Sequence, residues 1–210
     1  MNPSAPNTNR AVVRWAARYD LLIWFLTLGR ERRFREKLLA PVRLRPGESV
    51  LDVGCGTGSL AIAAKRQVGD TGAVQGIDAS HEMIARARHK ATKAGLAIDF
   101  AEASAELLPF PDATFDVVLS TVMLHHLRKS ARSVAVAEMR RTLKPGGRLL
   151  VVDFAGARNG KGPLMHFHRR GHVEPQVLMD LVSGAGLRVA AGGPLGTWSL
   201  SYVLAESPRL

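Results

Sequence analysis

The sequence is poor in cysteine, and Cys55 is the single example among its 210 residues. One cysteine cannot form an intramolecular disulfide and cannot supply a multi-cysteine zinc site. Long apolar runs are also missing, because the longest one near the N-terminus, residues 21–28, is too short to cross a bilayer. The polar N-terminus lacks the apolar core of a signal peptide. These absences lead us to expect a soluble, cytoplasmic protein.

Acidic residues are scarce near the N-terminus, so the excess of positive charge is local. Residues 1–46 contain 10 basic and 3 acidic residues, which gives +7 (10 − 3) of the net charge of +11. Apolar and aromatic side chains at residues 21–26 lie among these charges and indicate an amphipathic helix. Such a helix can pack on the domain core with its charged face in solvent, close over a substrate as a lid, or make peripheral contact with an anionic membrane surface. We expect no nucleic-acid partner, because no RNA- or DNA-binding signature is present. The sequence leaves the oligomeric state open.

Short apolar segments alternate with helical ones along the rest of the chain, which predicts an α/β fold. We expect a doubly wound sheet of seven strands that is mostly parallel, with the last strand antiparallel because no helix precedes it. The expected strands cover residues 49–53, 73–77, 96–101, 115–120, 148–154, 187–189 and 199–205. The expected helices cover residues 11–39, 59–68, 80–94, 130–143 and 175–185. The chain is divided into a basic helical segment, 1–46, and one domain, 47–210.

A glycine-rich loop follows the first expected strand in the stretch LDVGCGTG, residues 51–58. Glycines at alternate positions let the backbone turn tightly and approach a ligand closely. The N–H groups of the helix that follows suit a carboxylate or a phosphate. Ser59 replaces the last glycine of the dinucleotide fingerprint, and no Gly-Lys-Ser/Thr phosphate loop is present. The loop therefore argues against a nicotinamide-dependent oxidoreductase and against a P-loop nucleotidase.

Two acidic residues lie at strand ends beside this loop. Asp78 ends the second expected strand, where a carboxylate can accept hydrogen bonds from two ribose hydroxyls. Asp52 precedes the glycines, where a carboxylate suits an ammonium group and not a pyrophosphate. S-adenosylmethionine carries both a ribose and an amino-acid ammonium group, so it matches this pair of residues.

Five stretches between residues 49 and 154 resemble, in order and spacing, the motifs of the class I S-adenosylmethionine-dependent methyltransferases. They are LDVGCGTG, GIDAS, AELLPFPDATFDVV, LHHL and LKPGG. Within that class the chain is similar to the ubiquinone/menaquinone-biosynthesis methyltransferase group. The resemblance implies a Rossmann-like fold and S-adenosylmethionine as the cofactor.

The resemblance also implies which residues contact the cofactor. Asp52, Gly54 and Gly56 are expected beside its methionine part, Asp78 beside the ribose, and Ala79 and Met83 beside the adenine. Ser104 departs from the family, which places an aspartate there to accept from the adenine amino group. The complete expected set is Asp52, Gly54, Cys55, Gly56, Gly58, Asp78, Ala79, Met83, Ser104, Ala105, Ser120 and Thr121.

Two adjacent histidines, His125 and His126, follow the fourth expected strand on the ligand side of the sheet. Histidine exchanges protons near neutral pH, so either can act as the base that activates a methyl acceptor. We favour His126 because of its place in the LHHL motif. A further group, His166, His168 and His172, lies in a long connection that either contacts substrate or is an ordinary solvated loop. We expect no metal site.

Together these features predict an S-adenosylmethionine-dependent methyltransferase that acts on a small-molecule or lipid-like acceptor, such as a quinone or a phospholipid. A regulatory module that binds the cofactor without turnover is one alternative. A nucleic-acid methyltransferase is another, although no Asn/Asp-Pro-Pro-Tyr motif follows the fourth expected strand. The choice among carbon, oxygen and nitrogen methylation stays open.

Overall fold

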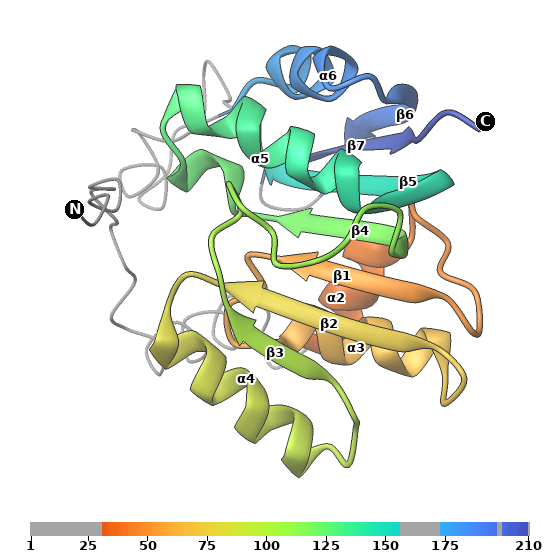
Figure 1. The fold of residues 1–210 in the computed structure, drawn as a ribbon, viewed down its shortest axis with the longest axis vertical. Coiled ribbons are helices and arrows are strands. Elements are labelled where there is room, and N and C mark those ends of the chain that lie inside the picture. The colour runs from red at the N-terminus through yellow and green to blue at the C-terminus, as the bar shows by residue number, and fades with distance from the viewer. Residues whose placement is uncertain (1–30, 156–172, 197–198, 210) are drawn as a thin grey trace.

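The structure is a computed structural model that describes residues 31–155, 173–196 and 199–209 (Figure 1). Its strands are β1 (Ser49–Val53), β2 (Ala73–Asp78), β3 (Asp99–Glu102), β4 (Phe115–Thr121), β5 (Leu143–Phe154), β6 (Arg188–Pro194) and β7 (Leu200–Glu206). Its helices are α2 (Glu31–Leu39), α3 (Ser59–Val68), α4 (His81–Lys93), α5 (Lys129–Thr142) and α6 (Pro175–Gly184), with the short 3-10 helix η1 (Leu124–His126).

All strands join one seven-stranded sheet in the order β3-β2-β1-β4-β5-β7-β6. The first five strands pair in parallel, whereas β7 runs antiparallel to both β5 and β6. The prediction of a doubly wound, mostly parallel sheet with an antiparallel last strand is therefore confirmed. The strand order reverses between β1 and β4, and such sheets bind their ligands outside the carboxyl ends of the strands at that point. These ends point to one edge of the sheet (Figure 1).

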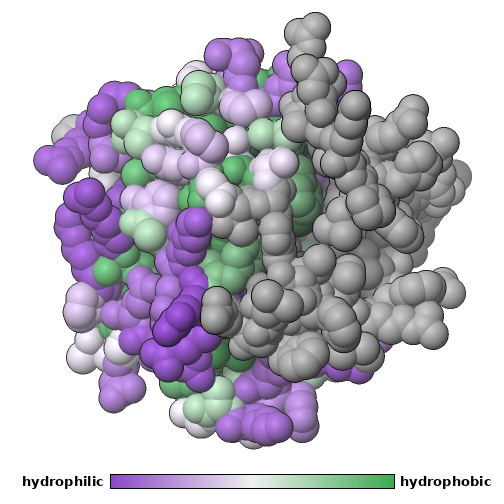
Figure 2. All heavy atoms as spheres, turned by 180° about the vertical axis from the view of Figure 1, so that it is seen from behind, coloured by the Kyte–Doolittle hydropathy of each residue, from purple (hydrophilic) through white to green (hydrophobic). Residues whose placement is uncertain are grey.

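Two apolar cores hold the layers together, one on each face of the sheet. Along β1, Val50 belongs to the core shared with α2, α3 and α4, while Leu51 and Val53 belong to the core shared with α5 and α6. Strands buried on both faces carry nearly continuous apolar runs, which explains why the strand segments were recognisable in the sequence. Figure 2 shows hydrophilic and hydrophobic residues interspersed on the described surface of the opposite side.

Strands β6 and β7 each begin one residue later than the sequence predicts, and β3 and β5 differ by more. Strand β3 begins at Asp99, and not at residue 96, because its pairing with β2 starts where Gln75 meets Asp99. Strand β5 begins at Leu143, which pairs with Phe115 ahead of an irregularity in the β4–β5 register. The LKPGG stretch thus forms the start of a strand, although its glycines indicated only a helix break.

Part of the basic N-terminal segment lies in the structure as α2, which packs against α3. Leu38 and Leu39 of this helix are buried in the core that also contains Val50 of β1. The rest of the helical segment predicted over residues 11–39 lies outside the described residues, so its membrane contact and the division at residue 46 stay predictions. Within the described residues, no helix has the length and apolar character to cross a membrane.

Candidate functional site

The glycine loop between β1 and α3 adopts a backbone that favours glycine at three positions. Gly54, Gly56 and Gly58 have φ angles of 76°, 54° and 77°. A Cβ atom on Gly54 would lie 2.3 Å from Cγ of Met123, and one on Gly58 would lie 2.9 Å from Cβ of Ala87. A Cβ on Gly56 would meet no atom of the described residues within 4 Å, so none of these residues covers the backbone there. The loop therefore packs tightly at its two ends and is accessible to a ligand at its centre.

Asp78 ends β2 and is held in place by the loop beside it. Its Oδ2 accepts a hydrogen bond from the backbone N–H of Gly56 at 3.0 Å, and its Oδ1 accepts one from the N–H of Ser80 at 2.9 Å. Burial raises the pKa of this carboxyl group, although these hydrogen bonds oppose the shift. Each oxygen keeps a second lone pair, so the carboxylate can also accept from two neighbouring hydroxyl groups.

Asp52 lies near the end of β1 and is almost fully buried, with 1% of its surface exposed. Its Oδ2 has no hydrogen-bond partner in the part of the chain that the structure describes. Burial raises the pKa of Asp52 to about 7, and the nearby Asp78 carboxylate adds to this shift, while the positive charge of Arg35 opposes it. A buried carboxylate oxygen without a donor indicates a place where a ligand can donate.

The remaining residues of the predicted cofactor set are divided between the loop, α4 and the segment after β3. Ala79 is exposed just after β2, whereas Met83 of α4 is buried. The Met83 N–H donates to the Ser80 hydroxyl, which confirms Ser80 as the N-cap of the helix. Cys55 is buried in the core, and burial raises the pKa of its thiol. The loop backbone at this position, and not the sulfur, is therefore the part available to a ligand.

Ser104 and Ala105 lie after β3 and are both half-buried. The hydroxyl of Ser104 accepts from the N–H of Glu106 at 3.3 Å and lies 3.5 Å from the carboxylate of Glu106. The family aspartate is thus replaced by a short side chain that is already engaged locally. A contact between Ser104 and the adenine stays a prediction.

Ser120 and Thr121 end β4, next to β1 and the glycine loop. The hydroxyl of Ser120 is buried and has no partner among the described residues. Thr121 is half-buried and pairs with Val152 of β5. The structure therefore places both residues at the predicted edge of the sheet, where β4 lies between β1 and β5.

The two predicted catalytic histidines differ in their surroundings. The Nδ1 atom of His125 lies 2.7 Å from Oδ1 of Asp153, and its backbone N–H donates to Oδ2 of Asp153 at 3.0 Å. The side chain of His125 is 7% exposed and that of Asp153 is fully buried. His126 is exposed, and its ring centroid lies 3.9 Å from that of His125. The structure thus gives a carboxylate partner to His125, although the sequence favoured His126.

Asp153 is a residue that the sequence analysis missed. It stands at the carboxyl end of β5, as Asp52 and Asp78 stand at the ends of β1 and β2. The signal was therefore available, because an acidic residue after a buried apolar run marks the ligand edge of this kind of sheet. Its partner, His125, lies 28 residues earlier in the chain. This contact could be predicted only if β4 and β5 were known to be neighbours in the sheet.

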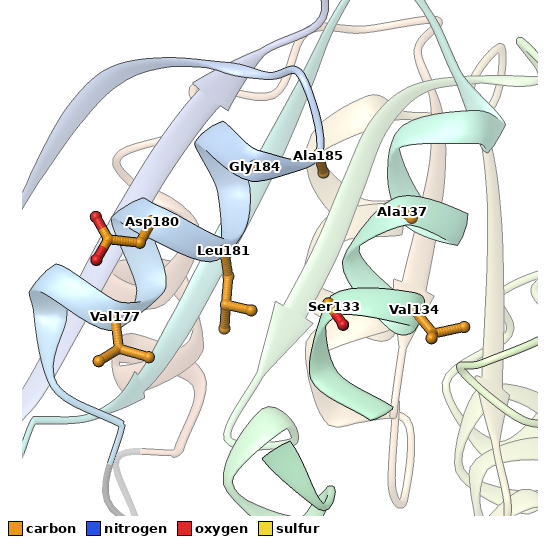
Figure 3. Close-up of a pocket in the computed structure, with 8 residues that line it drawn as sticks. All are labelled: Ser133, Val134, Ala137, Val177, Asp180, Leu181, Gly184 and Ala185. Atoms are coloured by element: carbon orange, nitrogen blue, oxygen red, sulfur yellow. The ribbon is translucent and has the colours of Figure 1, made fainter. Parts of the chain in front are cut away.

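A shallow groove lies elsewhere, between α5 and α6 (Figure 3). It is lined by side chains such as Val134 on α5 and Val177 and Leu181 on α6. The groove contains none of the predicted site residues. No cluster of metal-ligating side chains occurs among the described residues, and the predicted contacts of His166, His168 and His172 lie outside them.

The fold and this site define a Rossmann-like nucleotide-binding domain with a glycine loop after β1 and an acid at the end of β2. Residues 50–147 match a family model described as a methyltransferase domain. The UbiE ubiquinone/menaquinone biosynthesis C-methyltransferase of Paraburkholderia phytofirmans is 40% identical over 140 residues, which cover 67% of this chain and 57% of that protein. UbiE of Teredinibacter turnerae is 38% identical over 146 residues, which cover 69% of this chain and 58% of that protein. The chain thus spans less than two thirds of the length of these relatives.

Solved structures agree with these matches. A SAM-dependent methyltransferase from Aquifex aeolicus superposes with a TM-score of 0.71 at 27% identity, over 82% of this chain and 88% of that one. The [4+2]-cyclase SpnF superposes with a TM-score of 0.73 at 21% identity, over 86% of this chain and 82% of that one, which shows a common fold alone.

Residues 50–147 thus form a methyltransferase domain, and the chain is similar to the class I S-adenosylmethionine-dependent methyltransferases and, within that class, to the UbiE group. The predicted fold, class and cofactor are thereby confirmed. The residues present also fit this cofactor, because, among the described residues, Asp52 has an unpartnered buried oxygen and nothing covers the backbone at Gly56.

Proposed function

We propose that the protein transfers a methyl group from S-adenosylmethionine to a ring carbon of a small, apolar acceptor of the quinone type in its reduced, hydroxyl-bearing form. The observation that carries the proposal is the buried pair of His125 and Asp153 at the ends of neighbouring strands beside the glycine loop. The similarity to UbiE C-methyltransferases supports the class of acceptor and the choice of carbon as the methylated atom.

The cofactor would be held by the loop and by two carboxylates. Asp78 would accept from the ribose hydroxyls, since each of its oxygens already takes one backbone N–H and has a further lone pair. Gly54 and Gly56 would border the methionine part, and Asp52 would accept from its ammonium group. When bound, S-adenosylmethionine supplies an electrophilic methyl group on a sulfonium sulfur.

His125 would act as the base that activates the acceptor. A hydroquinone ring carbon becomes strongly nucleophilic when a ring hydroxyl loses its proton, here to His125. That carbon would take the methyl group as the S–CH3 bond breaks and the thioether S-adenosylhomocysteine leaves. The methylated carbon would then lose its own proton to solvent, which restores the aromatic ring, and the ring oxygen would take the proton back from His125. Because Oδ1 of Asp153 lies 2.7 Å from Nδ1 of His125, it keeps the proton on Nδ1 and makes Nε2 the basic atom. Phe154 packs edge-on against the His125 ring, with centroids 5.4 Å apart, and limits the access of water to it.

His126 has a different place in this proposal. Its exposed ring stacks against that of His125, so it lies on the solvent side of the pair. We assign it to the wall of the acceptor site and assign the proton to His125. The two histidines thus provide a matched pair of variants, since they are adjacent in sequence and only His125 contacts Asp153 in the hydrogen bonds described.

A donor with an isotope-labelled methyl group tests the proposal. The protein is incubated with this donor and, in parallel, with a prenylated hydroquinone, a phospholipid, an amine panel and an oligonucleotide. We expect label on a ring carbon of the hydroquinone, detected by mass spectrometry and located by NMR. The His125→Asn variant should lose about 100-fold or more in turnover, whereas His126→Asn should lose less than about tenfold.

The other outcomes each contradict the proposal in a different way. Label on oxygen or nitrogen only, or in the oligonucleotide only, would show that the acceptor class is wrong. Cofactor binding without transfer to any acceptor would indicate a regulatory module. A larger loss in His126→Asn than in His125→Asn would reverse the assignment of the base.

A further inference from the structure

Helix α2 places two charged side chains against the glycine loop, one turn of helix apart. Glu31 contacts the hydroxyl of Ser59, the first residue of α3, and lies 3.4 Å from a terminal nitrogen of Arg35. The ring of Phe34 lies 5.4 Å from the Arg35 guanidinium carbon. These contacts fix Arg35 on the side of α2 that faces the loop, where 8% of its surface is exposed.

Arg35 and Asp52 each have one buried polar atom that lacks a hydrogen-bond partner among the described residues. Among the residues that the structure describes, the Nε–H of Arg35 is a buried donor without an acceptor, and Oδ2 of Asp52 is a buried acceptor without a donor. The two groups are close enough for the charge of Arg35 to lower the pKa of Asp52, yet no ion pair joins them in the described part of the chain. Two buried, oppositely charged groups with one open position each are costly unless a third group satisfies both.

An α-amino-acid group meets both requirements. Its ammonium only donates hydrogen bonds and its carboxylate only accepts them, so they fit an aspartate and an arginine in turn. No other described side chain of the site carries a buried, unpartnered cationic donor. The glycine backbone at Gly54 and Gly56 runs between β1, which carries Asp52, and the start of α3, whose Ser59 contacts Glu31 of α2.

We propose that Arg35 binds the α-carboxylate of the methionine part of the cofactor, opposite Asp52, which takes the ammonium group. This inference rests on the proposed function, because it assumes that the site binds S-adenosylmethionine. It extends the site to α2, in a part of the chain that the sequence pattern assigned to a substrate lid or to membrane contact. Arg35 thus becomes a cofactor-specificity residue that distinguishes the intact amino acid from shorter thioether nucleosides.

Three ligands that differ only in the amino-acid part test the assignment by isothermal titration calorimetry. S-adenosylhomocysteine has both charged groups, its decarboxylated analogue keeps only the ammonium group, and 5′-methylthioadenosine has neither. The wild type should bind S-adenosylhomocysteine about 10- to 100-fold more tightly than the decarboxylated analogue. Arg35→Gln should weaken S-adenosylhomocysteine by a similar factor and leave 5′-methylthioadenosine within about twofold. The decarboxylated analogue should weaken much less than S-adenosylhomocysteine, since it loses only the effect of Arg35 on the ionisation of Asp52.

Arg32→Gln is the matched control, since Arg32 is on the same helix, is exposed and pairs with Glu36. It should leave all three affinities unchanged, while Arg35→Lys should keep part of the discrimination. The inference is overturned if Arg35→Gln weakens S-adenosylhomocysteine and its decarboxylated analogue alike, because Arg35 would then act only through the charge of Asp52. It is also overturned if the wild type binds those two ligands equally, a result that needs no variant to fold.

The failure of this inference can be told apart from the failure of the proposed function. If the wild type binds S-adenosylhomocysteine and its decarboxylated analogue equally, and both more tightly than 5′-methylthioadenosine, only the role of Arg35 is wrong. If it binds neither ligand, the cofactor site itself is wrong.

Discussion

Asp52 and Asp153 are both buried carboxylates at the carboxyl ends of strands, but their oxygens are used differently. Asp153 accepts three hydrogen bonds: two from His125, through its ring Nδ1 and its backbone N–H, and one from the backbone N–H of Phe154. Asp52 keeps an oxygen without a donor, and burial raises its pKa to about 7. A buried carboxylate that the protein satisfies orients a neighbouring group, whereas one that the protein leaves unsatisfied is available to a ligand. We therefore assign positioning of the base to Asp153 and cofactor binding to Asp52.

The largest effect is expected for Asp153→Asn. Asparagine offers one acceptor oxygen and an amide that only donates, so it cannot serve the three donors that meet at Asp153. Turnover at saturating cofactor should fall about 100- to 10,000-fold, because the His125 ring loses its tautomer and orientation. Calorimetry should give an affinity for S-adenosylhomocysteine within about twofold of wild type. A loss of cofactor affinity as large as the loss of turnover would contradict the separation of roles.

Gly54→Ala should disturb both the cofactor loop and the segment that carries His125, because Gly54 packs against Met123 between them. Its new Cβ would lie 2.3 Å from Cγ of Met123, just before the η1 segment that carries His125, and the φ angle of 76° is unfavourable for alanine. Urea denaturation should show a loss of about 3–4 kcal/mol in the free energy of unfolding, from overpacking and backbone strain together. The matched variant Gly56→Ala has the strain without the collision and should lose only about 1–2 kcal/mol. Equal losses of unfolding free energy in the two variants would show that the glycine loop and the His125 segment are not coupled through Met123.

Asp52→Asn is expected to change binding and not stability. The asparagine amide cannot attract an ammonium group as a carboxylate does, so the affinity for S-adenosylhomocysteine should fall about 10- to 100-fold. The melting temperature of the free protein at pH 8 should stay the same or rise, because the variant removes a buried charge. A marked drop in melting temperature would show that Asp52 stabilises the fold and would contradict this assignment.

The smallest effect is expected from pH. Since the folded Asp52 has a pKa above the ordinary value of 3.8, the free folded protein binds a proton more tightly than the unfolded chain does. The contribution of Asp52 to the stability of the free protein should therefore fall as pH rises from about 4 to about 7. Binding of an ammonium group requires the ionised form, so the affinity for S-adenosylhomocysteine should rise several-fold between about pH 6 and pH 8.

The other groups that face Asp52 are Arg35, Asp78 and the thiol of Cys55, and burial raises the pKa of both Asp78 and Cys55. Calorimetry in buffers of different ionisation enthalpy measures the proton released on binding near pH 6.5. Asp52→Asn should lose most of this release. An unchanged release in the variant would assign the titration to Asp78.

The sequence allowed the prediction of the fold and of half the site, for a physical reason. The glycine loop, Asp52 and Asp78 lie within two adjacent β-strands and their loops, so local patterns determine where they stand. Asp153 and Arg35 were not predicted, because their roles depend on partners distant in the chain. His125 lies 28 residues from Asp153, and Arg35 reaches the loop only through the packing of α2 against α3.

The start of β5 also depends on contacts with residues that are distant in the chain, here through the backbone. Its glycines indicated a break, yet the Gly146 N–H donates to the carbonyl of Ser207 at 3.1 Å, and the Ser207 N–H donates to the carbonyl of Gly147 at 2.8 Å. This pairing with the chain that follows β7 extends the strand, and no pattern local to LKPGG indicates it.

The most direct test of the cofactor site is a calorimetric titration of the wild type and of Asp78→Ala with S-adenosylhomocysteine. We expect the wild type to bind one equivalent, and Asp78→Ala to bind at least about tenfold more weakly, because the ribose hydroxyls lose their charged acceptor. No binding by the wild type, or equal affinity in the two proteins, would contradict the placement of the nucleoside at the ends of β1 and β2.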